Sequence, residues 1–271
     1  MTRAPLLDVL ELEQLDRDLF RSPRRETEQE RWHLFGGEVM AQALMAAVRT
    51  VEGRAPHSLH GYFLRRGLPD RDVILHVERD RDGGSFSARR VVAVQDGEVI
   101  FSLAASFHAE EDSGEFQVPP PTDVTSPENT APSPTHGGPT EHFEARVLGV
   151  TETSDLNLPT RMWVRTKGEL PDDPAVHACA LTYLTDFGSG FGEVDVPNLS
   201  RGGPSLDHVL WFHQPIRIDE WVLLDMWPLR ASGARGTYMG AVHDRTETLG
   251  CVFAQEALLR EGMGPPPKAG T

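Results

Sequence analysis

Apolar residues occupy almost every position of residues 172–186 (DDPAVHACALTYLTD), which predicts a helix that is buried on nearly all sides. Asp172 or Asp173 can cap the free amides at its start, and Pro174 suits the first turn, where a missing N–H costs nothing. A carboxylate at the other end opposes the helix dipole by about 0.3–1 kcal/mol. Asp186 therefore lies either in water or at the mouth of a core where chemistry needs an acid.

A second helix is predicted at residues 38–51, where apolar residues recur at helical spacing. Phe35-Gly36-Gly37 comes directly before it. Glycines at this place expose backbone amides at the positive end of a helix, which suits an anion or a polarised carbonyl oxygen. A plain junction between a loop and a helix gives the same pattern.

Alternating polar and apolar residues predict long antiparallel strands in both halves of the chain. Hairpin turns are expected at Asp82-Gly83-Gly84 and at Asp96-Gly97. The predicted strands span residues 57–64, 72–79, 85–95, 98–107, 143–150, 160–166, 205–215, 220–228, 233–243 and 248–260. Residues 1–21 fit a helix or a strand equally well. Long strands with one helix in each half predict a sheet curled around that helix.

The two halves resemble each other, which indicates an internal duplication. Ser58-Leu59 matches Ser205-Leu206, and Ala88-Arg89 matches Ala234-Arg235. Between the halves lies a stretch rich in Pro, Ser and Thr, which is typical of an exposed linker joining two units. The predicted organisation is an N-terminal unit at 1–112, a Pro-rich linker at 113–140, a C-terminal unit at 141–262 and a flexible tail at 263–271.

Composition limits the classes of function. The formal net charge of −15 argues against nucleic acid and anionic membranes as partners, so an anionic ligand needs a local basic patch. No run of 18 apolar residues exists, and acids interrupt the leucines near the N-terminus, so we expect a cytoplasmic protein without membrane insertion. Cys179 and Cys251 both lie in apolar runs and are predicted to be small buried hydrophobes.

Six motifs in order resemble the bacterial acyl-CoA thioesterase II family over nearly the whole chain. They are LFGGEVMAQAL, HSLHGYFLRRG, RDGGSFSARRV, WVRTKGELPDD, SLDHVLWFH and FAQEALLR. The resemblance implies an α+β double hotdog fold, with two tandem units that each wrap a curved antiparallel sheet around a long helix. It also implies hydrolysis of fatty acyl-CoA to free acid and CoA without a cofactor or metal, and assembly into a homodimer or higher homo-oligomer.

The resemblance also assigns catalytic residues. Asp186 matches the family's aspartate in a Tyr-x-x-Asp context, and Gln255 matches its glutamine before Glu256. Ser205 stands where the family usually has threonine, so the hydroxyl is kept and the methyl is lost. Together they would orient the hydrolytic water and accept its proton. Taken singly, Gln255 fits a solvent-facing amide and Ser205 a hydroxyl at the start of a strand.

Substrate-binding candidates follow from the same comparison. Backbone amides near Gly36 and Gly37 would polarise the thioester carbonyl. His57 either touches the thioester or CoA, or is structural. His208 is expected to pack with Trp211. The arginines that would hold the CoA phosphates, or else lie solvated on strand faces, are Arg65, Arg66, Arg89 and Arg90.

Other enzyme classes fit the chain less well. No G-x-S-x-G nucleophile elbow and no H-E-x-x-H metal motif is present. Cys179, in the middle of an apolar helix, suits packing better than a reactive thiol. An acyl-CoA binding protein and a hotdog-type acyl-thioester dehydratase stay open as alternatives.

Overall fold

Twelve strands and three α-helices make up the computed structural model, which describes residues 2–23, 33–133, 138–148, 160–194, 198–200 and 202–260. The helices are α1 (Leu6–Leu10), α2 (Gly36–Val48) and α3 (Pro174–Leu184). The strands of the first half are β1 (Glu13–Asp16), β2 (Leu19–Ser22), β3 (Ala55–Phe63), β4 (Val73–Asp82), β5 (Phe86–Gln95) and β6 (Glu98–His108). Those of the second half are β7 (Phe143–Leu148), β8 (Arg161–Thr166), β9 (Ser205–Phe212), β10 (Val222–Ser232), β11 (Arg235–Asp244) and β12 (Leu249–Leu258).

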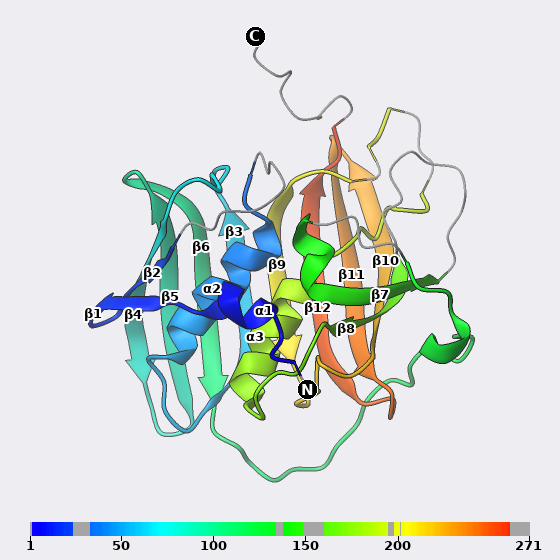
Figure 1. Ribbon diagram of the computed structural model, residues 1–271, viewed down its shortest axis with the longest axis horizontal. Helices are drawn as coiled ribbons and strands as arrows, with labels where there is room; N and C mark the ends of the chain where they lie inside the picture. Colours follow the sequence, from blue (N-terminus) through cyan, green and yellow to red (C-terminus); the bar gives the residue numbers. More distant parts are fainter. Residues whose placement is uncertain are drawn as a thin grey trace.

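All twelve strands form one antiparallel sheet in the order β1-β2-β4-β5-β6-β3-β9-β12-β11-β10-β8-β7. The two halves meet at the pair β3–β9, so the sheet continues across the boundary between them. Figure 1 shows α2 and α3 on the same side of this sheet, with the short α1 in front of them. The predicted architecture, one helix and one curved sheet in each half, is confirmed. The ambiguous N-terminal stretch forms both a helix and a strand hairpin.

Irregularities in strand pairing recur at matching places and fix how the two units correspond. The shift at Arg79/Arg81 in the β4–β5 pair recurs at Pro228/Arg230 in β10–β11. By the same comparison, Pro56 of β3 in the first unit is the counterpart of Ser205 of β9 in the second unit. The sequence match of Ser58 with Ser205 is therefore wrong by two positions, a slip that keeps every side chain on the same face. The match of Ala88-Arg89 with Ala234-Arg235 is wrong by three positions, because Arg89 corresponds to Tyr238.

Burial explains why α3 is apolar all round. One hydrophobic cluster runs through both units, and α2 and α3 pack against each other inside it. The expected capping is also present, because Asp173 accepts a hydrogen bond from the Ala175 amide at 2.9 Å and Pro174 is the first helical residue. Cys179 and Cys251 are free and fully buried, as expected.

The stretch between the units runs along the outer face of the second unit. The Trp163 indole donates to the Thr125 carbonyl at 2.8 Å, and Arg245 pairs with Glu128 at 2.6 Å. Val124 packs against an outer cluster of Trp163, Trp221 and Leu223, so the sheet here is apolar on both faces. Residues 134–137 of the predicted linker, the end of the predicted strand 143–150 and the predicted tail lie outside the described residues.

We expect Asp173→Ala to lower the free energy of unfolding by about 1 kcal/mol, because α3 loses its only side-chain cap at Ala175. Urea unfolding followed by far-UV circular dichroism measures this. Asp172→Ala is the matched control, since Asp172 is 95% exposed and pairs only with surface Arg217. A change of less than about 0.5 kcal/mol is expected for the control, and equal losses in both variants would contradict the assignment of the cap.

Candidate active site

Three polar side chains from distant parts of the second unit meet at the end of α3. Asp186 lies two residues beyond the helix, and its side chain is only 6% exposed. Its Oδ1 accepts from the Ser205 hydroxyl at 3.1 Å, and the Gln255 amide donates to the same hydroxyl oxygen. The structure thus brings together all three residues to which the family resemblance gives a catalytic role.

The first unit supplies a fourth group, because the start of α2 abuts Asp186. The Gly37 amide donates to Asp186 Oδ2 at 2.8 Å. A Cβ on Gly36 would lie 2.8 Å from this same oxygen, and one on Gly37 would lie 2.5 Å from the Tyr183 carbonyl. The two glycines therefore permit the close approach. The Gly37 amide, expected to face a substrate carbonyl, instead holds the carboxylate at the positive end of the helix.

Burial sets the acidity of the carboxylate. Removal from water raises the pKa of Asp186 to about 6, while the Gly37 amide and the Ser205 and Gln255 side chains oppose that shift. A carboxylate with a pKa near the working pH is ionised at pH 7 yet basic enough to take a proton from water.

His208 also reaches this cluster, in disagreement with the sequence prediction. It is fully buried with its ring stacked on Phe253, and Nδ1 lies 3.9 Å from Asp186 Oδ1. Trp211 is 42% exposed on the other face of β9, so the predicted packing with Trp211 is wrong. The two residues are three apart, an odd spacing that places them on opposite faces of a strand. That spacing was the signal available in the sequence.

In the first unit, Arg89 fills the space beyond the end of α2 that corresponds to the Asp186 cluster beyond the end of α3. This arginine is 2% exposed, and its guanidinium donates to the Thr50 hydroxyl at 2.8 Å, to the Thr50 carbonyl at 3.0 Å and to Asp82 at 2.7 Å. It also donates to the Arg81 and Ala88 carbonyls. The prediction that Arg89 holds CoA is therefore wrong, because its donors are used inside the protein.

The other binding candidates are spread along the first unit. His57 lies six residues from Phe63, whose ring contacts Gly36, which puts it roughly 20 Å along β3 from the cluster. There it pairs with Ser106 at 2.8 Å. Arg90 lies on the outer face and pairs with Glu78 and Asp80.

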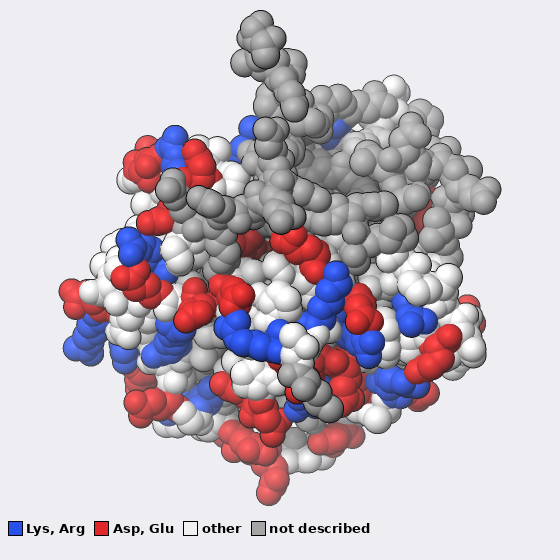
Figure 2. All heavy atoms as spheres, in the orientation of Figure 1, with Lys and Arg blue, Asp and Glu red and all other residues white. Residues whose placement is uncertain are grey.

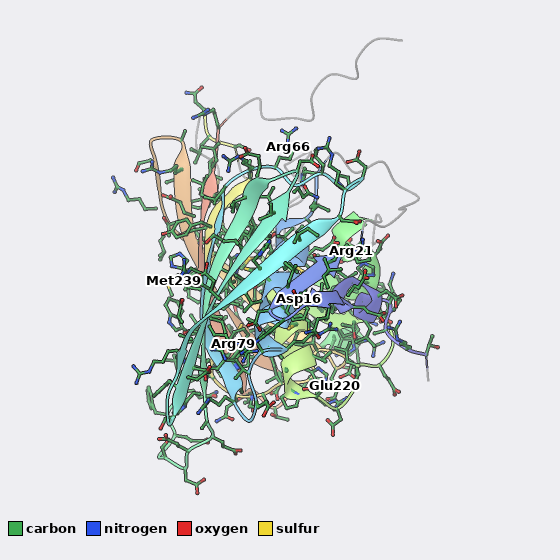
Figure 3. The ribbon with its side chains drawn as sticks, turned by 90° about the vertical axis from the view of Figure 1, so that its left-hand side faces the viewer. Asp16, Arg21, Arg66, Arg79, Glu220 and Met239 are labelled. Carbon is green, nitrogen blue, oxygen red and sulfur yellow. The ribbon has the colours of Figure 1, made fainter. Side chains whose placement is uncertain are left out.

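Arg65 follows the end of β3 that faces the cluster, and it pairs with Glu98 at 2.9 Å. Figure 3 shows the neighbouring Arg66 beyond this end of the sheet and Arg79 towards the other. On the face shown in Figure 2, positive and negative side chains are interspersed. Among these arginines, Arg65 and Arg66 are thus the ones next to the start of α2.

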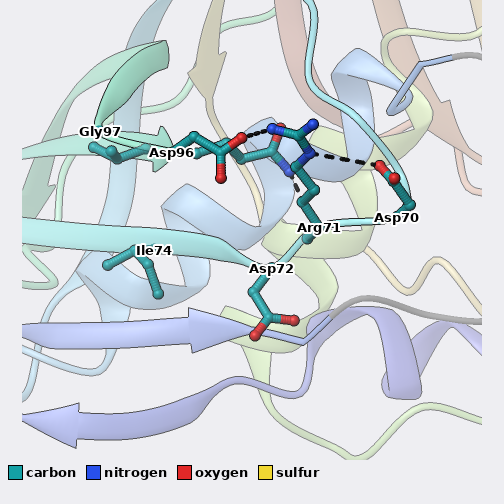
Figure 4. A pocket seen from close by; sticks show the side chains of 8 residues that line it. Asp70, Arg71, Asp72, Ile74, Asp96 and Gly97 are labelled. Atoms are coloured by element: carbon teal, nitrogen blue, oxygen red, sulfur yellow. Dashed lines mark hydrogen bonds and ion pairs between the residues drawn. The ribbon is translucent and has the colours of Figure 1, made fainter.

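A hollow of about 450 Å³ lies elsewhere, where β4 begins and β5 ends. In it Arg71 is held between Asp70 and Asp96 (Figure 4). None of its lining residues belongs to the Asp186 cluster. Within the described ranges, no group of three or more His, Cys, Asp or Glu side chains is placed to hold a metal ion. No helix of the described part is long and apolar enough to cross a bilayer.

Comparison with known proteins decides the family. Residues 25–108 match a model of the acyl-CoA thioesterase N-terminal domain, and residues 117–259 match the C-terminal domain of the same enzymes. The chain belongs to the acyl-CoA thioesterase family. A relative is acyl-coenzyme A thioesterase 8 of Mus musculus, 36% identical over 93% of this chain and 88% of that protein.

Solved structures of similar proteins show the same fold. An acyl-CoA thioesterase II from Mycobacterium marinum superposes with a TM-score of 0.78 at 35% identity, covering 94% of this chain and 98% of that one. A protein from Alicyclobacillus acidocaldarius described as having a hot dog fold gives 0.76 at 19% identity, covering 98% and 100%. The α+β double hotdog fold expected from the sequence is confirmed.

Arg89→Met is expected to lower the free energy of unfolding by about 1–3 kcal/mol, because the buried Thr50 hydroxyl and carbonyl lose their donor. Arg90→Met, one position along on the exposed face, should change it by less than about 0.5 kcal/mol. Chemical denaturation of both variants is the measurement. A stable Arg89→Met protein with a raised KM for acyl-CoA would return Arg89 to the binding site.

Proposed function

We propose that this protein hydrolyses fatty acyl-CoA to free fatty acid and CoA by direct attack of a water that Asp186, Ser205 and Gln255 align. The observation that carries the proposal is the shared network: one buried carboxylate bonded to one hydroxyl, which in turn accepts from one amide. Such a set can fix the position of a water and accept its proton without forming a covalent intermediate.

The chemical steps follow from the charges in the site. Ionised Asp186 takes one proton from the water while the oxygen attacks the thioester carbonyl carbon. The resulting tetrahedral intermediate collapses by breaking the carbon–sulfur bond, which leaves the fatty acid and the CoA thiolate. The proton held by Asp186 then passes to the thiolate, so that the carboxylate is ionised for the next cycle. Ser205 and Gln255 keep their protons throughout, which suits groups that orient rather than titrate.

Substrate contacts are proposed at the start of α2 and beyond β3. The Gly36 amide, next to the Gly37 amide that Asp186 occupies, would stabilise negative charge on the carbonyl oxygen. Arg65 would contact the phosphates of CoA from the adjoining end of β3. His57 lies far along β3 from this place and Arg90 lies on the outer face, so we leave both out of the binding site.

The organisation and setting are part of the same proposal. We divide the chain into units at 1–112 and 141–262 around the Pro-rich segment, and we expect it to act in the cytoplasm as a homodimer or higher homo-oligomer. The alternatives of an acyl-CoA binding protein and an acyl-thioester dehydratase have no feature of the site in their favour. Release of free thiol from palmitoyl-CoA distinguishes the hydrolase, whereas an enoyl product would identify a dehydratase.

Asp186→Asn and Gln255→Ala should each lower kcat at least about 100-fold, because the water loses its proton acceptor or its orientation. Thiol release from palmitoyl-CoA measures this, with circular dichroism to verify folding. Glu256→Gln is the control, since Glu256 lies next to Gln255 on the opposite face of β12 and pairs with surface Arg235. Near-wild-type turnover in either site variant would remove that residue from the mechanism.

The pH dependence of activity and that of stability should oppose each other. The pKa of Asp186 is about 6 in the folded protein against 3.8 for the free group, so kcat/KM should fall about tenfold per pH unit below pH 6. The unfolded chain loses this proton first, so the contribution of Asp186 to stability is greatest below pH 4 and falls by about 3 kcal/mol between pH 4 and 6.

Asp186→Asn tests the stability side, because it should abolish that loss and be the more stable protein at pH 7. Urea titrations at pH 4, 5, 6 and 7 measure the difference between the two proteins. Parallel curves for wild type and variant would contradict the assigned ionisation.

A further inference from the structure

His208 is a buried group that the proposed chemistry does not yet use. Neither of its ring nitrogens has a hydrogen-bond partner among the described residues, and the same holds for Gln255 Oε1 beside it. His208 and Gln255 are direct partners across β9 and β12. A buried polar group without a partner destabilises a fold, so its presence needs a reason other than stability.

The first unit shows what the fold itself requires at this position. Matching the pairing irregularities places Leu59 of β3 where the second unit has His208, and Ala105 of β6 where it has Gln255. Both first-unit residues are as buried as their counterparts. An aliphatic side chain therefore satisfies this place in the architecture, and the imidazole is an addition made only at the end that holds Asp186.

The surroundings keep the imidazole uncharged. Burial lowers the pKa of His208 to about 4, while the Gln255 side chain opposes the shift. The other titratable groups that bear on the pair are Tyr238 of β11 and, across the sheet, Asp207 and His60. Burial raises the pKa of Tyr238, so it is neutral, and Asp207 and His60 bond each other at 3.1 Å. His208 thus carries one ring proton and no net charge near pH 7.

We propose, on the basis of the proposed hydrolytic function, that His208 is a positioning residue whose neutral ring donates from Nδ1 to Oδ1 of Asp186 in the substrate complex, and so holds this carboxylate ionised and aimed at the water. The two atoms lie 3.9 Å apart without substrate. Distances of this kind commonly shorten in the Michaelis complex.

The test compares His208→Leu with His208→Asn. Leucine copies the first unit, so the variant should fold and melt about 2–4 °C above wild type, since an unpaired buried polar group is removed. Its kcat at pH 7 should fall about tenfold, and the acid limb of its kcat profile, which reports the substrate complex, should move up by about one unit, because Asp186 loses a donor. Asparagine places an N–H close to the position of Nδ1. His208→Asn should therefore have a turnover within about threefold of wild type and an acid limb within about 0.3 pH units of wild type.

His213→Leu is the matched control, because His213 follows β9 on the exposed side and should leave the acid limb in place. An unshifted limb in His208→Leu, or equal losses in the Leu and Asn variants, would overturn the proposal. The titration of Asp186 in the complex with a non-hydrolysable acyl-CoA thioether, followed by carbon-13 NMR of labelled aspartate and assigned with Asp186→Asn, separates the two proposals. If the wild-type protein releases no thiol, the proposed hydrolase function is wrong. If Asp186 has the same titration midpoint in wild type and in His208→Leu, the proposed role of His208 is wrong.

Discussion

The structure depends on one contact, the hydrogen bond between the Gly37 amide and the Asp186 carboxylate. A buried carboxylate is costly unless donors replace its water, and here the start of one helix meets the end of the other to supply one. Because Gly36 and Gly37 carry no Cβ, the two helices approach closely enough for this bond. The first unit therefore completes a cluster whose other members come from the second, and neither unit alone contains it.

The duplication explains why one end of the molecule carries chemistry and the other does not. The two units share strand pairing down to the positions of their irregularities, so both build the same wall behind a helix end. In the second unit this wall presents Ser205, His208 and Gln255 to Asp186. In the first unit, Arg89 closes the matching space through hydrogen bonds to Thr50 and the neighbouring backbone. The first unit thus fills this place with satisfied hydrogen bonds, whereas the second unit leaves polar atoms of His208 and Gln255 without partners among the described residues. This difference is expected when an active site loses stability in return for activity.

The segment between the units adds a second layer to the sheet. Trp163 and Trp221 lie on the outer face of the second unit, where Val124 and the Thr125 carbonyl cover them. Arg146 and Arg165 lie over the Trp221 ring at 5.0 and 4.6 Å, and these cation–π contacts stabilise the cluster. The sheet is therefore packed on both sides at β8 and β10, towards the edge of the second unit.

The sequence by itself determined the elements and much of the site. Hydrophobic periodicity located both long helices and the main strands, because periods of 3.6 and 2 residues report directly which face is buried. The family motifs named Asp186, Ser205 and Gln255. Only the tertiary structure decided that Arg89 is internal, that the repeat match is shifted by two positions in β3 and β9 and by three in β5 and β11, and that His208 faces Asp186. These depend on strand register and on which helix end meets which wall, and a slip of two residues leaves the sequence pattern of a strand unchanged.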